Sequence, residues 1–112
     1  MRRLRAAFPT HAFVGEEEAA AAAAAGIPTP KVGREPTWCV DPLDGTANFV
    51  HGWPFVCVSI GLVADGAPVL GVVFNPVMDE LFVGVRGRGA TLNGAAIRVS
   101  GERDLARALV GT

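Results

Sequence analysis

The sequence predicts an α+β fold built on a mostly antiparallel sheet with few helices. Apolar, β-prone runs follow one another at short intervals, and two of their connections, Asp65-Gly66 and Asn93-Gly94, have the composition of tight turns. These dipeptides between apolar runs are strong hairpin signals, and consecutive hairpins form an antiparallel sheet. Such a sheet must cover at least one face with helices, yet few segments of this chain have helical composition.

The first half of the chain contains two predicted strands and one ambiguous segment. Residues 12–14 form a short strand. Residues 16–25 consist of three glutamates and seven alanines, which favour helix, but an isolated helix of two turns is marginal without packing. This segment is therefore predicted to be either a helix or a surface loop. Turn-rich residues 31–36 then lead to a strand over residues 37–40.

The second half is predicted to form the hairpins. Residues 55–64 are almost continuously apolar, which is typical of a strand buried on both faces. Further strands are expected over residues 69–74, 81–85, 90–92 and 97–99. Residues 103–110 fit an amphipathic helix, or the start of another strand, with inward positions at Leu105, Leu109 and Val110. Because few helices remain to cover the sheet, the chain is expected to expose apolar sheet surface.

Composition indicates one ordinary domain and excludes several classes of partner. The chain has 112 residues, 50% of them hydrophobic, with 10 basic and 11 acidic side chains and a net charge of −1. No basic stripe favours nucleic acid or a membrane surface. No apolar run approaches the roughly 18 residues that span a bilayer, and the opening residues are too short for a signal peptide. A cytoplasmic location is the default expectation, with a plastid as the alternative if a targeting segment precedes the chain.

The two cysteines lie inside β-prone runs. Cys39 stands in Trp-Cys-Val and Cys57 in Val-Cys-Val, so both are predicted to be buried small hydrophobic residues. Their spacing indicates neither a zinc site nor a disulfide framework.

Two carboxylates, Asp41 and Asp44, end the run that begins at Thr37. Pro42 biases Asp41 toward extended backbone, and a turn after it brings Asp44 back beside Asp41. Two unpaired carboxylates about 4 Å apart repel by roughly 4 kcal/mol at an effective dielectric near 20, so one is protonated or a cation lies between them. Magnesium prefers such oxygen ligands. The alternative is an Asp-Pro turn in which Asp44 caps a short helix.

Several motifs together resemble the inositol monophosphatase family. Residues 41–46, Asp-Pro-Leu-Asp-Gly-Thr, preceded by Trp38 and followed by residues 48–52, are similar to the family signature. Residues 13–17, Phe-Val-Gly-Glu-Glu, resemble its Gly-Glu-Glu metal motif. Residues 54–61, 71–76 and 89–94 also fit, in the family's order. The resemblance implies a magnesium-dependent, lithium-sensitive phosphomonoesterase with a layered α-β-α-β-α sandwich, in which this chain supplies the larger sheet.

The resemblance also implies an extent for the domain. Members of the family begin with a helical pair before the Gly-Glu-Glu motif. They continue into a second half that supplies another metal-binding Asp and most residues that select the substrate. Residues 1–112 are therefore expected to be a partial, metal-motif-bearing N-terminal half, a central fragment of the complete architecture.

Residue roles follow from the same resemblance. Glu16, Asp41 and the Leu43 backbone carbonyl are implied ligands of a first magnesium ion, and Asp41 bridges to a second ion that Asp44 also holds. Paired metals activate a water molecule and stabilise the leaving alkoxide. Glu16 and Thr46 are the implied catalytic residues that orient this water, while backbone N–H groups hold phosphate oxygens at a helix start. The implied substrate-binding residues are Glu16, Leu43, Asp44, Gly45 and Thr46.

The expected activity is hydrolysis of myo-inositol monophosphate to myo-inositol and phosphate. L-galactose 1-phosphate and histidinol phosphate are alternative substrates. The alternative of a different class is an inactive fragment that binds metal weakly or pairs with a full-length subunit. Mg²⁺ is the expected cofactor and Li⁺ the expected inhibitor. The expected partner is a small phosphorylated polyol or sugar, with no nucleic acid or membrane, and the full-length parent is expected to be a homodimer.

Overall fold

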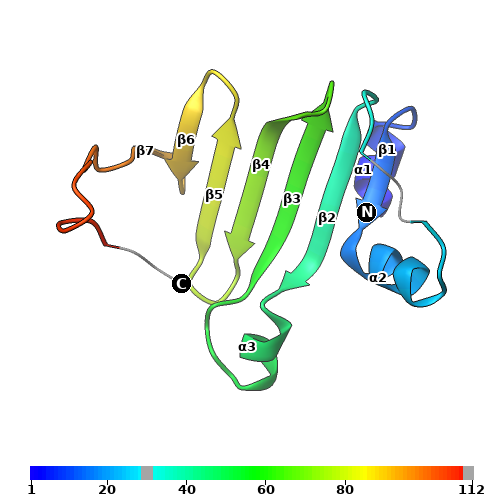
Figure 1. Ribbon diagram of the computed structural model, residues 1–112, viewed down its shortest axis with the longest axis horizontal. Helices are drawn as coiled ribbons and strands as arrows, with labels where there is room; N and C mark the ends of the chain where they lie inside the picture. The colour runs from blue at the N-terminus through cyan, green and yellow to red at the C-terminus, as the bar shows by residue number, and fades with distance from the viewer. Residues whose placement is uncertain (29–31, 110–112) are drawn as a thin grey trace.

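A computed structural model of the protein describes residues 1–28 and 32–109. The described strands form one seven-stranded sheet whose spatial order follows the sequence (Figure 1). Strands β1 and β2 are parallel, and every other neighbouring pair is antiparallel. The predicted mostly antiparallel sheet is thus confirmed. The strands are β1 (Ala12–Gly15), β2 (Thr37–Asp44), β3 (Cys57–Ala64), β4 (Ala67–Asn75), β5 (Glu80–Val85), β6 (Gly89–Leu92) and β7 (Ala95–Ile97).

The hairpin turns form where their composition predicts them. Asp65 and Asn93 adopt φ values of 51° and 49°, and Gly66 and Gly94 follow them at 72° and 82°. Positive φ at both central residues is what a type I′ turn requires. These turns set the β3–β4 and β6–β7 pairings, so local chemistry accounts for both hairpins.

In the described part of the chain, three short helices accompany the sheet: α1 (Arg2–Ala7), α2 (Glu16–Ala24) and α3 (Thr46–Val50). The ambiguous glutamate-alanine segment is a helix, with its glutamates in the first turn, where negative charge interacts favourably with the helix dipole. It contacts β1 and β2, which supplies the packing that a short helix needs. Helix α1 lies outside the elements predicted from the sequence.

The best-packed part of the protein surrounds Trp38 on β2. Its side chain is only 6% exposed, and its indole Nε1 donates a hydrogen bond of 3.0 Å to Nδ1 of His11. The Phe8 ring lies 5.0 Å from that of His11 and 5.2 Å from that of Trp38. This aromatic group ties the segment after α1 to β2. The buried apolar side chains of the described residues are Trp38, Val40 and Val56, so the small core lies along β2 and the segment that leads into β3.

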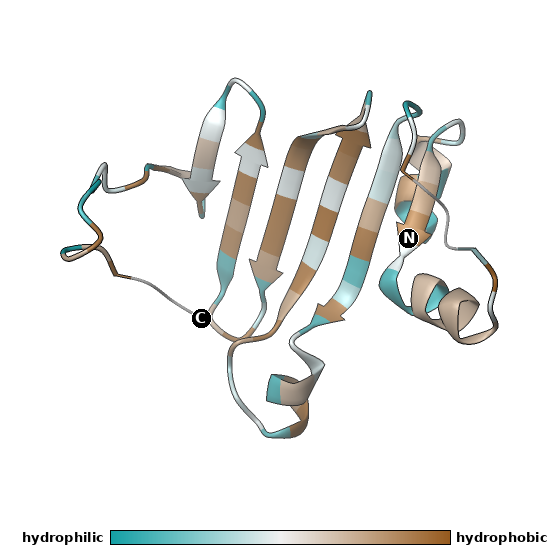
Figure 2. Cartoon of the chain, in the orientation of Figure 1, coloured by the Kyte–Doolittle hydropathy of each residue, from teal (hydrophilic) through white to brown (hydrophobic). Residues whose placement is uncertain are grey.

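The rest of the sheet is poorly covered. The three helices lie beside β1 and β2 or beyond the end of the sheet, and none of them covers β4 to β7 (Figure 1). Apolar bands run along β3 to β5 (Figure 2), and most residues of these strands are half-buried or exposed. The prediction that residues 55–64 are buried on both faces was wrong, because β3 is only half-buried along its whole length. The expected exposure of apolar sheet surface is confirmed by Val73, Leu81 and Ile97.

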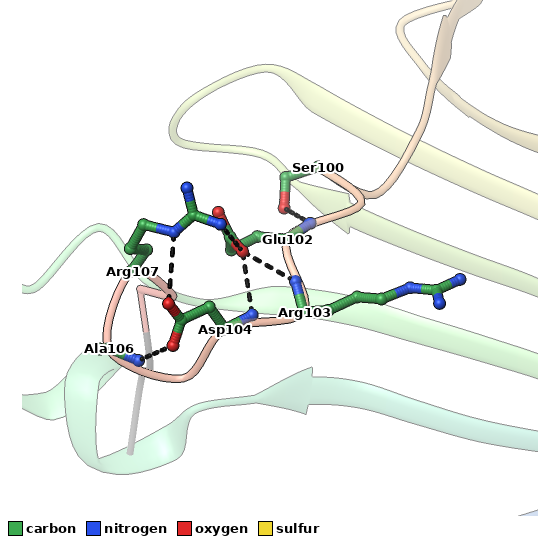
Figure 3. A network of polar contacts seen from close by, with 6 residues as sticks. All are labelled: Ser100, Glu102, Arg103, Asp104, Ala106 and Arg107. Atoms are coloured by element: carbon green, nitrogen blue, oxygen red, sulfur yellow. Dashed lines mark hydrogen bonds and ion pairs between the residues drawn. The ribbon is translucent and has the colours of Figure 1, made fainter.

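The predicted helix or strand over residues 103–110 was wrong for residues 103–109, and Val110 lies outside the described residues. Side chains and backbone of this segment bond to one another instead (Figure 3). Asp104 Oδ1 accepts a hydrogen bond of 3.0 Å from the Ala106 amide, and Arg107 donates one of 3.1 Å to Glu102. Leu105 is 84% exposed. Hydrogen bonds between side chains and nearby backbone compete with helix formation, and they are formed here.

The open sheet surface predicts poor solution behaviour for the isolated chain. Contiguous exposed apolar surface binds hydrophobic dyes and promotes association. We expect anilinonaphthalene sulfonate fluorescence to rise on addition of the chain, and size-exclusion chromatography to show concentration-dependent larger species. A monomeric protein with a cooperative unfolding transition and no dye binding would contradict this expectation.

Candidate metal and phosphate site

Strand β2 carries both predicted aspartates and is irregular between them. Asp41 pairs with Ser59 and Asp44 pairs with Cys57, so three steps along β2 oppose two steps along β3. In a regular strand, residues three apart point to opposite faces of the sheet. A bulge inserts one additional residue, so two residues that flank it three positions apart point to the same face. Since Ser59 and Cys57 share a face, and opposed residues point the same way, Asp41 and Asp44 share that face.

The bulge also explains how Pro42 is accommodated. Proline lacks the N–H that a ladder hydrogen bond requires, so within sheets it is found at edges and bulges. The Leu43 amide, next along the chain, donates a hydrogen bond of 3.0 Å to Oδ1 of Asp41, which orients the carboxylate locally. The predicted strand over residues 37–40 was too short, because β2 continues to Asp44. A bulge within the strand, not a turn after it, brings the two aspartates to one face.

The pKa of Cys57 is affected by the negative charges on this face. Its thiol donates a hydrogen bond of 3.7 Å to Oδ2 of Asp44. Desolvation raises the pKa of Cys57, and the negative charges of Asp44 and Asp41 raise it further. Both carboxylates therefore act on the same group. The prediction that Cys39 and Cys57 are buried was wrong, since both are half-buried.

Glu16 approaches the same face from β1. It is the first residue of α2 and directly follows Gly15, which pairs with Val40. Glu16 and Asp41 line one open hollow, while Asp44 lines the neighbouring one. Asp44 thus lies outside the hollow that Glu16 and Asp41 share. Within residues 1–28 and 32–109, no group of three or more His, Cys, Asp or Glu side chains is close enough to hold a metal ion ready-made.

The donor chemistry nevertheless fits a hard cation. Two carboxylates share a face, and a third lies across an adjoining hollow. Oxygen ligands of this kind suit magnesium, which keeps several water molecules and needs few protein carboxylates.

The turn after Asp44 is built around Gly45. This residue adopts φ 83° and ψ 38° and precedes α3, which begins at Thr46. A Cβ at Gly45 would lie 2.7 Å from the carbonyl oxygen of Phe55, so no larger residue fits without a shift of the backbone. The predicted helix start after Asp44 is confirmed, and Thr46 is exposed there. Backbone N–H groups thus follow the aspartates directly.

Sequence reasoning missed two asparagines beside this turn. Asn48 Nδ2 donates a hydrogen bond of 2.8 Å to the carbonyl of Phe55, and Asn75 Nδ2 donates one of 2.9 Å to the carbonyl of Pro54. The Asn-Pro dipeptide at residues 75–76 is a turn signal that would have drawn attention to Asn75. The hydrogen bond from Asn75 to the Pro54 carbonyl joins residues far apart in the sequence, so no local sequence pattern predicts it.

Comparisons with known proteins agree with this arrangement. The profile of the inositol monophosphatase family matches residues 1–112. Inositol monophosphatase 2 of Solanum lycopersicum is 59% identical over 109 residues, which are 97% of this chain and 40% of that protein. A solved inositol monophosphatase from Anabaena is 40% identical with a TM-score of 0.75, covering 90% of this chain and 37% of that one. An inositol monophosphate-bound structure of SaIMPase-II is 30% identical with a TM-score of 0.71, covering 87% and 34%.

These matches define the class and then the family. The sheet is that of an α-β sandwich, as in the solved structures that it matches, which confirms the predicted fold class. The chain belongs to the inositol monophosphatase family. It spans about 40% of the length of the curated relatives it matches. No described helix is long and apolar enough to cross a membrane.

The charges around Cys57 predict an alkaline shift of its alkylation. Iodoacetamide reacts with the thiolate, and the raised pKa of Cys57 moves thiolate formation to higher pH. In metal-free buffer, Asp44→Asn removes one of the negative charges and should lower the pH at which half of Cys57 reacts. Peptide mass spectrometry separates Cys57 from Cys39, whose labelling in the same sample reports any loss of the fold. An unchanged pH profile of Cys57 would refute the assigned electrostatic coupling.

Proposed function

We propose that this chain carries part of the metal and phosphate site of a magnesium-dependent phosphate monoesterase. One observation carries the proposal. The β2 bulge sets Asp41 and Asp44 on one face, immediately before the left-handed Gly45 that leads into α3. Membership of a family named for phosphatase activity supports the assignment.

The residues proposed to hold Mg²⁺ are Glu16, Asp41, Asp44 and the backbone carbonyl of Leu43. When bound, the metal supplies positive charge beside the phosphate and lowers the pKa of coordinated water. The Leu43 amide restrains Asp41 through its Oδ1 hydrogen bond, so this ligand is partly oriented in advance. Preorganised ligands lose less conformational freedom when they bind.

The proposed phosphate contacts are the backbone N–H groups of Gly45 and Thr46. Amide groups of this kind bind anions without a competing side-chain charge. The Thr46 hydroxyl and the Glu16 carboxylate are proposed to orient the attacking water. Thr46 is exposed, so its hydroxyl is accessible to substrate and solvent.

The proposed substrate is a small phosphorylated polyol, with myo-inositol monophosphate preferred over L-galactose 1-phosphate and histidinol phosphate. The names of the relatives support this preference, as does the structure of SaIMPase-II bound to inositol monophosphate. The full-length protein is proposed to act in the cytoplasm as a homodimer, with Li⁺ as an inhibitor.

A second proposal applies to the 112 residues alone. The chain matches only 40% of its tomato relative, and its described part holds no preformed cluster of three metal-ligating side chains. We propose that these residues by themselves bind Mg²⁺ weakly and release little phosphate.

A chimera tests both proposals. The matched 109 residues of the tomato relative would be replaced by those of this chain. Phosphate release from myo-inositol monophosphate is expected with Mg²⁺ and not with a chelator, while the 112-residue chain should be close to inactive. A folded chimera without phosphatase activity would overturn the proposed function.

Two substitutions in the chimera separate metal binding from turnover. Asp41→Asn removes the negative charge shared by both metal positions, so it should weaken Mg²⁺ binding and abolish hydrolysis. Thr46→Ala keeps every carboxylate and removes a hydroxyl that orients water. It should lower turnover about 10²- to 10⁴-fold, the range for loss of a positioned catalytic group, with little change in Mg²⁺ affinity.

Calorimetric Mg²⁺ titrations and phosphate release measure the two effects. Asp65→Asn is the matched control, because it removes the same charge from an exposed β3–β4 turn that tolerates Asn. Turnover by Asp41→Asn close to that of the unmodified chimera would be fatal to the proposed mechanism.

A further inference from the structure

Two asparagine side chains join the loop of residues 51–56 to its neighbours at one end of the sheet. This end carries α3, the end of β4 and the start of β5 (Figure 1). Asn48 Nδ2 donates to the carbonyl of Phe55 at 2.8 Å, and Asn75 Nδ2 donates to the carbonyl of Pro54 at 2.9 Å. We call these two residues the asparagine clamp. The proposed function uses neither of them.

Asn75 uses both ends of its amide. Its Oδ1 accepts hydrogen bonds of 2.9 Å from the Val77 amide and 3.0 Å from the Met78 amide, while its Nδ2 reaches Pro54. It is only 8% exposed. A buried amide with three protein partners is sensitive to substitution, because each lost bond leaves a polar group to find another partner. Asn75 thus connects the β4–β5 turn to the loop beside α3.

The loop in turn fixes the position of Gly45. The Phe55 carbonyl accepts the Asn48 hydrogen bond and is the same atom that would lie 2.7 Å from a Cβ at Gly45. The backbone of Gly45 therefore packs directly against this carbonyl. A displacement of Pro54 and Phe55 toward Gly45 would therefore press on the turn of Gly45 and Thr46, because the Phe55 carbonyl occupies the place that a side chain at Gly45 would need.

We propose that Asn75 is a positioning residue for this turn. By holding Pro54, it keeps Phe55 in the place against which Gly45 packs, and so sets the direction of the Gly45 and Thr46 amides. The turn's role as a phosphate contact rests on the proposed function, whereas its placement by Asn75 does not. The simpler role, in which Asn75 only caps the β4–β5 turn, predicts a different response to substitution.

Asn75→Asp separates the two roles. Aspartate keeps oxygens that accept from the Val77 and Met78 amides but cannot donate to Pro54. Asn93→Asp is the matched control, since Asn93 also accepts from one amide, that of Leu81, and donates to one carbonyl, that of Asp79. It makes the same chemical change between the β6–β7 turn and the start of β5, and neither of its partners belongs to the loop of residues 51–56.

Hydrogen exchange read by mass spectrometry tests the placement in the 112-residue chain without metal. Asn75→Asp should speed exchange of residues 45–53 about three- to tenfold, as expected for loss of one hydrogen bond, with exchange of β3 unchanged. Asn93→Asp should leave residues 45–53 at the unmodified rate. Exchange of residues 45–53 that stays unchanged in Asn75→Asp, or rises equally across the sheet, would overturn the proposal. Should Asn75→Asp not fold, Asn48→Ala tests the other half of the asparagine clamp by the same criterion.

Kinetics in the chimera test the consequence for the site. Asn75→Asp should lower kcat about ten- to a hundredfold, the effect of a small misplacement of a positioned group, and change KM less, while Asn93→Asp leaves both unchanged. A kcat unaffected by Asn75→Asp would overturn the positioning role. If the unmodified chimera is inactive, the proposed function is refuted. The hydrogen-exchange experiment on the 112-residue chain then still tests whether Asn75 positions the turn at Gly45.

Discussion

The bulge in β2 is the constraint on which the rest of the site depends. Without it, Asp41 and Asp44 would point to opposite faces of the sheet. With it, both aspartates oppose residues on one face of β3, and Pro42 occupies a position where a missing N–H is tolerated. The left-handed Gly45 follows at once, so strand, carboxylates and turn form one continuous unit of the chain.

The incomplete coverage of the sheet leaves the face that carries Asp41 and Asp44 half-open. The aromatic group around Trp38 packs one end of the sheet, but the described helices leave β4 to β7 open. The site therefore lies on a half-open face, where Asp41 and Asp44 act on Cys57 and raise its pKa. Their repulsion is a reason to expect a cation at this face. The asparagine clamp then secures the adjoining turn, so that carboxylates and amides are held by separate sets of contacts.

Features that depend on neighbouring residues could be predicted from the sequence, and features that depend on distant ones could not. Asp65-Gly66 and Asn93-Gly94 predict their hairpins because positive φ is a local requirement. The pairing of Asp44 with Cys57, and the bond from Asn75 to Pro54, are non-local and appear only in the folded chain. The expectations for burial of β3 and for a helix or strand over residues 103–109 failed because they required packing partners that the described chain does not provide. The site residues were identified by resemblance to a family, whereas their common face is explained by the bulge.

Paramagnetic broadening by Mn²⁺, a substitute for Mg²⁺ with the same preference for oxygen ligands, tests most directly whether the bulge creates a cation site. In nuclear magnetic resonance spectra of the isotope-labelled chain, substoichiometric Mn²⁺ should first broaden the amide signals of Asp41, Asp44 and Ser59. Broadening centred instead on Asp79 and Glu80, with the β2 signals unaffected, would contradict the account.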